Sequence, residues 1–173
     1  MAHAPHPEAP RATRLVALSR RRGSPLTDLG GWYTGLVGSL TEIAPGVLVA
    51  TSSFALTTTT VVVGPEGGCL LIDPGVTVAE LAGLAAELGR RDLVPAVAWS
   101  THPHWDHVLW SRELGDAPRY AAPAAVRIAE TERPGMIDGV EHDAPGHDLE
   151  LFGRLVALDA AAIGWDGPGQ ALR

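Results

Sequence analysis

The chain has 173 residues, enough for one domain that buries a sizeable core. Apolar residues make up 46% of it and charged residues 19%, a balance typical of a globular interior and not of a disordered chain. The formal net charge of −7 argues against general nucleic-acid binding, because a phosphate backbone attracts a basic surface.

The usage of particular residues also indicates in which cellular compartment the protein occurs. The one cysteine, Cys69, excludes an internal disulfide and fits a reducing cytosol, so we expect a cytoplasmic protein with a buried thiol. All thirteen basic residues are arginine and glycine is abundant, which indicates a GC-rich bacterial coding sequence. No apolar stretch reaches the roughly 18–20 uncharged residues of a membrane helix, so we expect no membrane contact.

The first 44 residues differ in composition from the rest. They are rich in Arg, Pro and Gly, and the apolar run Leu15–Leu18 is shorter than the roughly 7–15-residue core of a signal peptide. We interpret residues 1–44 as a flexible extension and residues 45–173 as the domain. A basic contact with an acidic partner is the alternative role for the extension.

A β-rich pattern begins at Gly46. Residues 47–50 form a short apolar run, and residues 56–63 are dominated by β-branched side chains, which favour a strand over a helix. The glycine-rich segment 64–68 predicts a hairpin loop, and residues 69–72 return as the next strand.

A βαβ unit follows. Thr77 and Glu80 have the spacing of a capping box, apolar residues recur at helical spacing up to Leu88, and Gly89 offers a stop. The apolar run 94–99 predicts a buried strand parallel to 69–72. Both strands therefore end at the edge where such units carry their catalytic loops.

The remaining chain predicts a mixture of short elements. We expect a short helix over 108–114, a strand over 119–122 and a helix over about 124–132, with a break at Pro134–Gly135. The apolar spacing in 147–158 predicts another helix, and residues 165–169 form a turn signal.

The most informative segment is His102-Pro103-His104-Trp105-Asp106-His107. His102 and His104 are two positions apart at the end of a predicted strand, so they point to the same side in an extended chain. Asp106 and His107 follow where the chain turns. Imidazole and carboxylate are the usual protein ligands of zinc and similar ions, so this clustering favours a metal site over unrelated surface histidines.

Residues 101–107 resemble the His-x-His-x-Asp-His signature of the metallo-β-lactamase superfamily, and residues 69–75 resemble its upstream strand and Asp-x-Gly turn. The resemblance covers roughly residues 45–170. Val108-Leu109-Trp110 stands where the family commonly has Gly-Gly, and this segment and residues 165–168 resemble a subgroup of bacterial hydrolase-like members.

The resemblance implies roles for the motif residues. His102 and His104 would bind a first metal ion, and Asp106 and His107 a second. Zinc is the usual ion, one or two per site, ahead of iron or manganese. Asp106 would also act in catalysis by orienting the metal-bound water or taking its proton. Asp73 either holds the loop or an imidazole in place or is a plain turn residue.

The resemblance also implies parts that the sequence does not clearly provide: a third His and a bridging carboxylate. Ala144-Pro145-Gly146-His147 resembles the turn with the third His, but residues 148–158 have helical spacing and Asp159 comes too early to bridge two ions. We therefore expect an α/β protein (α+β) of the family's αβ/βα sandwich type, with only its first half complete and the domain truncated at its C-terminus.

Two functions remain open. The first is a zinc-dependent hydrolase in which metal-activated water attacks a small ester, amide or thioester. The second is a catalytically incomplete member that binds metal or a partner chain and completes its site as a homo-oligomer.

Overall fold

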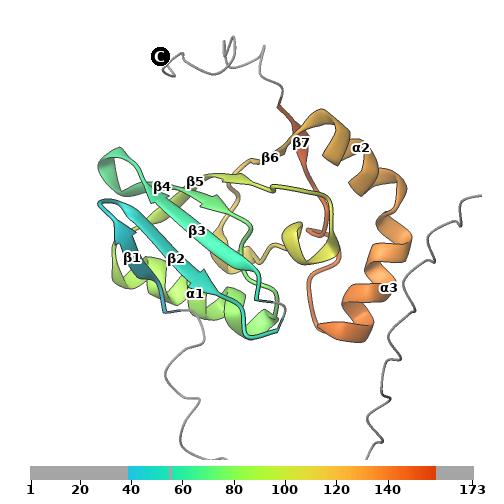
Figure 1. Ribbon diagram of the computed structural model, residues 1–173, viewed down its shortest axis with the longest axis horizontal. Helices are drawn as coiled ribbons and strands as arrows, with labels where there is room; N and C mark the ends of the chain where they lie inside the picture. The colour runs from blue at the N-terminus through green and yellow to red at the C-terminus, as the bar shows by residue number, and fades with distance from the viewer. Residues whose placement is uncertain (1–38, 55, 159–173) are drawn as a thin grey trace, which may run out of the picture. The chain divides into compact units, whose positions relative to one another are not determined.

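The computed structural model describes residues 39–54 and 56–158. These residues form one seven-stranded sheet with three α-helices and three short 3₁₀ helices (Figure 1). The strands are β1 (Thr41–Ala44), β2 (Val47–Thr51), β3 (Thr58–Val63), β4 (Gly68–Ile72), β5 (Val94–Trp99), β6 (Arg119–Ala121) and β7 (Val156–Ala157). The helices are η1 (Pro65–Gly67), α1 (Val78–Arg90), η2 (Trp105–His107), η3 (Arg112–Leu114), α2 (Pro123–Thr131) and α3 (Arg133–Asp143).

The strands lie in the sheet in the order in which they occur along the chain. Strands β1 to β4 pair antiparallel, and β4 to β7 pair parallel. Strands β2, β4 and β5 consequently run in the same direction, and their carboxyl ends meet at one edge of the sheet. The mixed α/β fold and the parallel βαβ unit predicted from the sequence are confirmed.

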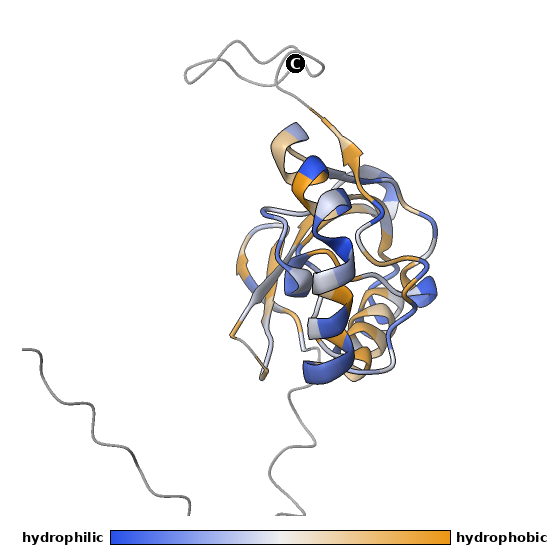
Figure 2. Ribbon diagram, turned by 90° about the vertical axis from the view of Figure 1, so that its right-hand side faces the viewer, coloured by the Kyte–Doolittle hydropathy of each residue, from blue (hydrophilic) through white to orange (hydrophobic). Residues whose placement is uncertain are grey.

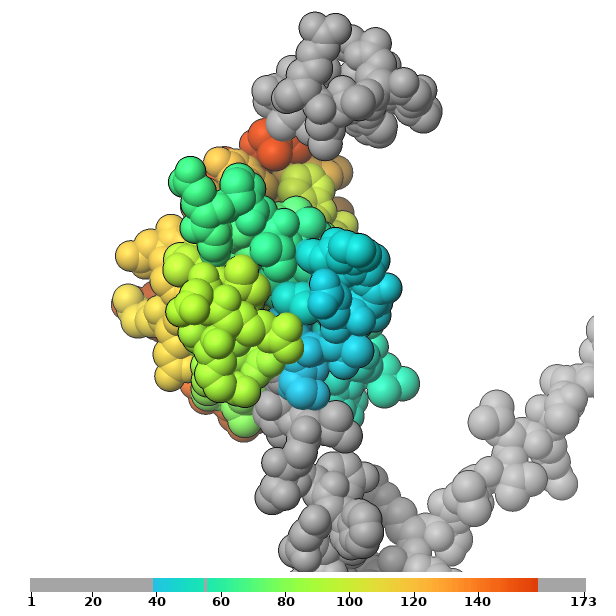
Figure 3. Space-filling view, turned by 90° about the vertical axis from the view of Figure 1, so that its left-hand side faces the viewer, coloured from blue at the N-terminus to red at the C-terminus, as the bar shows by residue number. Residues whose placement is uncertain are grey.

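Helix α1 begins where the sequence predicts. The Thr77 hydroxyl accepts a hydrogen bond from the Glu80 backbone N–H, and the Glu80 carboxylate accepts one from the Thr77 N–H, which completes the capping box. Gly89 does not end the helix, which continues to Arg90. Figure 3 shows α1 on the molecular surface beside the β1–β2 hairpin.

The core lies on one face of the sheet. The strand residues in its main cluster all point to that face, and α1 adds an apolar stripe to it; these residues are Leu48, Val61, Cys69, Leu71 and Ala98, with Leu81, Leu84 and Leu88 from the helix. Helix α2 packs on the same face, where Ala125 and Val126 join Ala121 of β6. The described residues thus form a sheet layer and a helix layer.

The opposite face of the sheet is uncharged between β2 and β5. By strand register it carries Val47, Val49, Thr60, Val62, Leu70, Ile72, Val97 and Trp99, all of them half-buried or exposed. Val62, for example, is 36% exposed. One face of the sheet is therefore helix-covered and the other is an apolar surface.

Several sequence predictions for the region after β5 need correction. The helix expected over 108–114 is only the 3₁₀ turn η3, because Val108, Leu109 and Trp110 are buried in the core in a non-helical conformation. Pro134–Gly135 does not break the chain but opens α3, since proline lacks only an N–H that the first helical turn leaves unpaired. Figure 2 shows α3 facing the viewer, with hydrophilic stretches interrupted by short hydrophobic ones.

The helix predicted over 147–158 is wrong. This segment forms turns that end in the short strand β7. Arg119 and Arg133 donate hydrogen bonds to the carbonyl oxygens of Leu149, Leu151 and Phe152, which satisfies backbone groups that a helix would otherwise pair. The strand over 119–122 and the helix over 124–132 are confirmed as β6 and α2, within one residue at each end.

The sheet begins slightly before the domain boundary expected at residue 45. Strand β1 pairs with β2, and Leu40 is buried, with its carbonyl oxygen 2.9 Å from the Arg91 guanidinium that donates to it. The extension up to residue 38, Asp159 and the predicted turn at 165–169 lie outside the described residues. Within 39–54 and 56–158, no helix has the length and apolar character needed to cross a membrane.

Candidate metal centre

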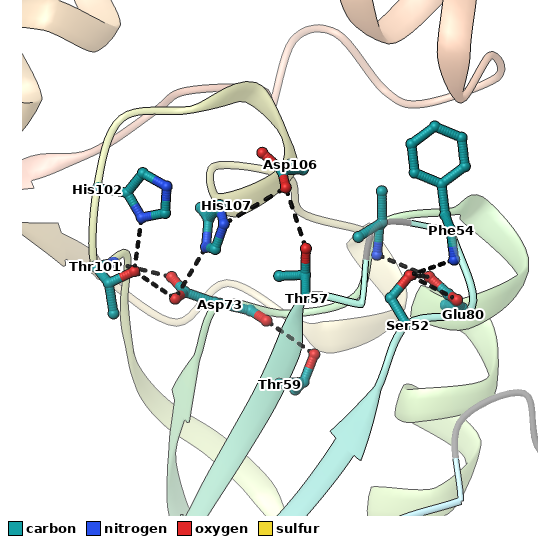
Figure 4. A network of polar contacts seen from close by, with 11 residues as sticks. Ser52, Phe54, Thr57, Thr59, Asp73, Glu80, Thr101, His102, Asp106 and His107 are labelled. Carbon is teal, nitrogen blue, oxygen red and sulfur yellow. Dashed lines mark hydrogen bonds and ion pairs between the residues drawn. The ribbon is translucent and has the colours of Figure 1, made fainter. Parts of the chain in front are cut away.

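The motif projects from the carboxyl edge of the sheet. Strand β5 ends at Trp99, whose carbonyl oxygen accepts a hydrogen bond from the Asp73 N–H at 3.0 Å. The turn after β4 and the loop after β5 are therefore joined at their first residues. Figure 4 shows Asp73, Thr101, His102, Asp106 and His107 gathered at this edge.

The structure brings the three histidines of the motif together. The ring centroid of His102 lies 3.8 Å from that of His107 and 4.6 Å from that of His104. Asp106 lies beside them, with its Oδ2 atom 3.5 Å from Nε2 of His107. The side chains expected to form the site thus form one cluster on a loop and the short helix η2.

Asp73 supports this loop. Asp73 is 4% exposed, and its carboxylate accepts hydrogen bonds from the Thr101 N–H at 2.9 Å and the Thr101 hydroxyl at 2.5 Å. Its Oδ2 atom also lies 3.0 Å from Nδ1 of His107. This Nδ1 atom is fully buried, and within residues 39–54 and 56–158 it makes no well-aligned hydrogen bond, so Asp73 is its nearest polar contact. Of the two roles considered for Asp73, contact with the loop and the imidazole is the one the geometry favours.

Thr57 is a contact that sequence reasoning missed. Its hydroxyl donates to Oδ2 of Asp106 at 3.1 Å. Thr57 belongs to a run of four threonines that the sequence assigns to one strand, but β3 starts only at Thr58, two residues after Leu56, whose φ of 57° is positive. No signal in the run distinguishes Thr57 from its neighbours; only the antiparallel course of β3 puts it at the site.

The pKa values of His102 and His107 are shifted in opposite directions. Burial, and then the nearby His107 and His104, lowers the pKa of His102. Burial alone would lower the pKa of His107 as well, but the contact with Asp73 and the charge of Asp106 outweigh it, so the pKa of His107 is raised. His107 therefore takes up a proton more readily than His102, and a bound cation would compete with that proton.

The donor set fits a divalent metal ion. Nδ1 of His107 faces a carboxylate, an arrangement that ligating histidines commonly adopt and that leaves Nε2 for an ion. However, no three His, Cys, Asp or Glu side chains in the described part of the chain are arranged around one point as ligands would be. The rings of His102 and His107 pack against each other, so coordination requires their side chains to rotate.

His147 is placed differently from the motif histidines. Its half-buried ring has Nε2 2.9 Å from the carbonyl oxygen of Val76, in the turn before α1. Burial lowers the pKa of His147, and the hydrogen bond to Val76 only partly opposes this. The contact with Val76 occupies Nε2 and leaves only Nδ1 for an ion, and within the described part of the chain His147 belongs to no group of three potential ligands.

Cys69 is not a nucleophile in this arrangement. It is 2% exposed within β4, and burial raises the pKa of its thiol. This agrees with the buried thiol predicted from the sequence.

Residues 54–169 match the family model of the metallo-beta-lactamase superfamily. The chain belongs to this superfamily. Its match takes in the whole histidine cluster and the turn at Asp73, which the structure brings into contact.

Solved structures match part of this chain at low sequence identity. A beta-lactamase domain protein from Burkholderia ambifaria is 16% identical with a TM-score of 0.50, over 71% of this chain and 45% of that one. The metallo-beta-lactamase DIM-1, in a crystal exposed to ceftazidime, is 16% identical with a TM-score of 0.48, over 55% of this chain and 47% of that one. The superfamily member described here thus spans about half the length of the solved structures it matches. No curated protein sequence matches it.

Proposed function

We propose that the chain provides the metal-binding part of a zinc-dependent hydrolytic site. The observation that carries this proposal is the cluster of three imidazoles and two carboxylates at the carboxyl edge of the sheet. His102, His104, Asp106 and His107 are the proposed ligands. A bound zinc ion lowers the pKa of its water to roughly 7 and so supplies a nucleophile at neutral pH.

The protein's own groups have defined roles in this proposal. Asp73 holds the ring of His107 through its Nδ1 atom, and Thr101 fixes Asp73 by two hydrogen bonds. Asp106 orients the attacking water or takes its proton, with its own carboxylate held by Thr57. The proposed substrate is a small ester, amide or thioester. The acidic net charge disfavours nucleic acid, and the single cysteine favours the cytoplasm.

Metal content tests the ligand assignment. The purified protein and the double variant His102→Ala/His104→Ala are loaded with zinc, dialysed and analysed for bound metal. We expect about one ion per chain in the unmodified protein and little in the double variant. His142→Ala is the control, because it removes an exposed imidazole on α3. Equal zinc in all three proteins would refute the assignment.

A second candidate is a catalytically incomplete protein that binds metal or another chain. It is favoured by the absence of a three-ligand arrangement within residues 39–54 and 56–158 and by the uncharged sheet face. Exposed apolar surfaces of this kind favour association, so this candidate includes a homo-oligomer.

Turnover and oligomeric state separate the two candidates. For the second, we expect weak or no hydrolysis of ester, β-lactam, thioester and phosphodiester substrates, and a mass above that of a monomer in light scattering. Val62→Glu, which puts a charge on the uncharged face, should lower that mass. Zinc-dependent turnover by a monomer, abolished by His104→Ala, would instead establish the hydrolase.

A further inference from the structure

Glu80 is a buried carboxylate that joins two loops at the edge of the sheet. It is 7% exposed, in the first turn of α1. From the β4–α1 turn it accepts the N–H groups of Val76 and Thr77, at 2.9 and 3.0 Å. From the β2–β3 loop it accepts the Ser52 hydroxyl at 2.9 Å and the Ser53 N–H at 3.0 Å. A capping box requires only the N–H of Thr77, so the bonds to Val76 and to the β2–β3 loop are additional.

Both loops that Glu80 joins reach the proposed metal site. The β4–α1 turn carries Asp73, and at its Gly75 an added Cβ would lie 3.1 Å from the Glu80 Cβ, so the turn packs tightly on this side chain. In the β2–β3 loop, the Ser52 N–H donates to the Thr57 carbonyl oxygen at 2.8 Å. The hydroxyl of that same Thr57 donates to Asp106.

Hydrogen bonds thus link Glu80 to Ser52, Ser52 to Thr57 and Thr57 to Asp106, and Figure 4 shows the first and the last of them. A second contact runs beside these bonds: the ring of Phe54 meets that of Trp105 edge to face, with centroids 5.8 Å apart. The β2–β3 loop is thus held by Glu80 at one end and touches η2, the helix that carries Asp106, at the other.

The carboxylate form of Glu80 suits this role. Burial alone would raise the pKa of Glu80, but the N–H groups of Thr77, Val76 and Ser53 and the Ser52 hydroxyl outweigh it, so the pKa is lowered. An ionised carboxylate accepts all these donors with its two oxygens. A glutamine keeps the shape but turns its NH₂ group toward N–H and O–H donors, so at least one of the two loops loses its bond.

We propose that Glu80 is a positioning residue of the metal site, which holds the β2–β3 loop so that Thr57 fixes the Asp106 carboxylate. The inference rests on the proposed function insofar as Asp106 is a ligand. Neither Glu80 nor Thr57 needs to touch the ion. Loss of either one should therefore leave an intact fold with a misplaced ligand.

The experiment uses Co²⁺ as a coloured substitute for zinc and compares matched variants of the full chain. Glu80→Gln removes acceptors from the loop, and Thr57→Val removes the hydroxyl in a side chain of equal size. Thr57→Ser restores the hydroxyl. Glu87→Gln is the control, because Glu87 is also 7% exposed on α1 but pairs with Arg90 and Arg91 instead of the loop.

We expect Glu80→Gln and Thr57→Val to weaken Co²⁺ binding by about 10-fold, the scale on which groups that orient ligands act, and to alter its visible absorption. Thr57→Ser and Glu87→Gln should keep the affinity and spectrum of the unmodified protein. If Glu80→Gln and Thr57→Val also keep them, Glu80 stabilises the fold only and the proposal is overturned.

Amide hydrogen exchange of the metal-free proteins keeps this test separate from that of the proposed function. Glu80→Gln should speed exchange at Ser52 and also at His107 and Val108, whose N–H groups bond within η2. Faster exchange at Ser52 alone would overturn the proposal. If the unmodified protein binds no metal, the proposed function fails, and the exchange pattern still decides whether Glu80 positions η2.

Discussion

Oδ2 of Asp73 lies 3.0 Å from Nδ1 of His107, although the two residues follow different strands of the sheet. The contact depends on parallel pairing of β4 with β5, which brings their carboxyl ends side by side. The turn after one strand thereby supports an imidazole of the loop after the next.

Replacement of Asp73 should accordingly weaken metal binding without removing a ligand. In Asp73→Asn the side chain keeps its size but no longer offers two charged oxygens to Thr101 and His107. We expect a loss of zinc affinity of about 10–100-fold, measured by competition with a chelating dye. Asp116→Asn, at an exposed position, is the control. An unchanged affinity in Asp73→Asn would mean that His107 needs no carboxylate to hold it.

For His147, by contrast, we expect that replacement has little effect on zinc affinity. Because the ring of His147 bonds to Val76 and stands apart from the cluster of His102, His104 and His107, His147→Ala should change zinc affinity by less than the roughly 10-fold typical of groups that support a site. The same dye competition measures it. A larger loss would identify His147 as a ligand and would indicate a complete site in this chain.

The buried ring of His147 should also make stability depend on pH. Its pKa is lowered in the folded state, whereas the unfolded chain takes up a proton near pH 6.5. The unfolded state then binds more protons as the pH falls below about 6.5, so the free energy of unfolding decreases until the pH passes the folded-state pKa.

Urea unfolding between pH 7.5 and 5 measures this effect. His147→Gln keeps a donor for Val76 without the titration, so its stability should fall less steeply than that of the unmodified protein. His142→Gln should follow the unmodified protein, because the imidazole at position 142 is exposed. Parallel curves for His147→Gln and the unmodified protein would contradict the expectation.

The cap of α1 should contribute measurably to the fold. Thr77→Ala removes the hydroxyl that accepts the Glu80 N–H, at a cost of about 1 kcal/mol in the free energy of unfolding. Thr77→Ser retains an oxygen in the same place and should recover most of the loss. Equal stability of the alanine and serine variants in urea would show that the hydroxyl does not matter.

Alanine substitutions at two glycines test how rigid the loop before β4 is. Gly67 and Gly153 both have positive φ, but an added Cβ at Gly67 would lie 2.8 Å from the Asp92 carbonyl oxygen, whereas at Gly153 it meets no atom within 4 Å. Alanine at either position carries the conformational cost of roughly 1–2 kcal/mol. Gly67→Ala should lower the melting temperature further than Gly153→Ala, and an equal loss would mean that the loop shifts freely.

Sequence reasoning succeeded where the deciding interactions are local. The capping box at Thr77 and the strand 94–99 depend on neighbouring residues, and both were predicted. The segment 147–158 was misassigned because Arg119 and Arg133, distant in sequence, hydrogen-bond to its carbonyl groups. In the site, the motif 102–107 was evident, but the contact of Thr57 with Asp106 arises only from strand pairing.

The order of the strands has a consequence for how the sheet can be built. Each strand lies next to the one synthesised before it, from β1 to β7. A chain leaving the ribosome can therefore add strands one at a time to a single growing border, without waiting for a distant segment to close a gap. The loop that carries the histidines emerges only after β4 and the Asp73 turn are already available to receive it.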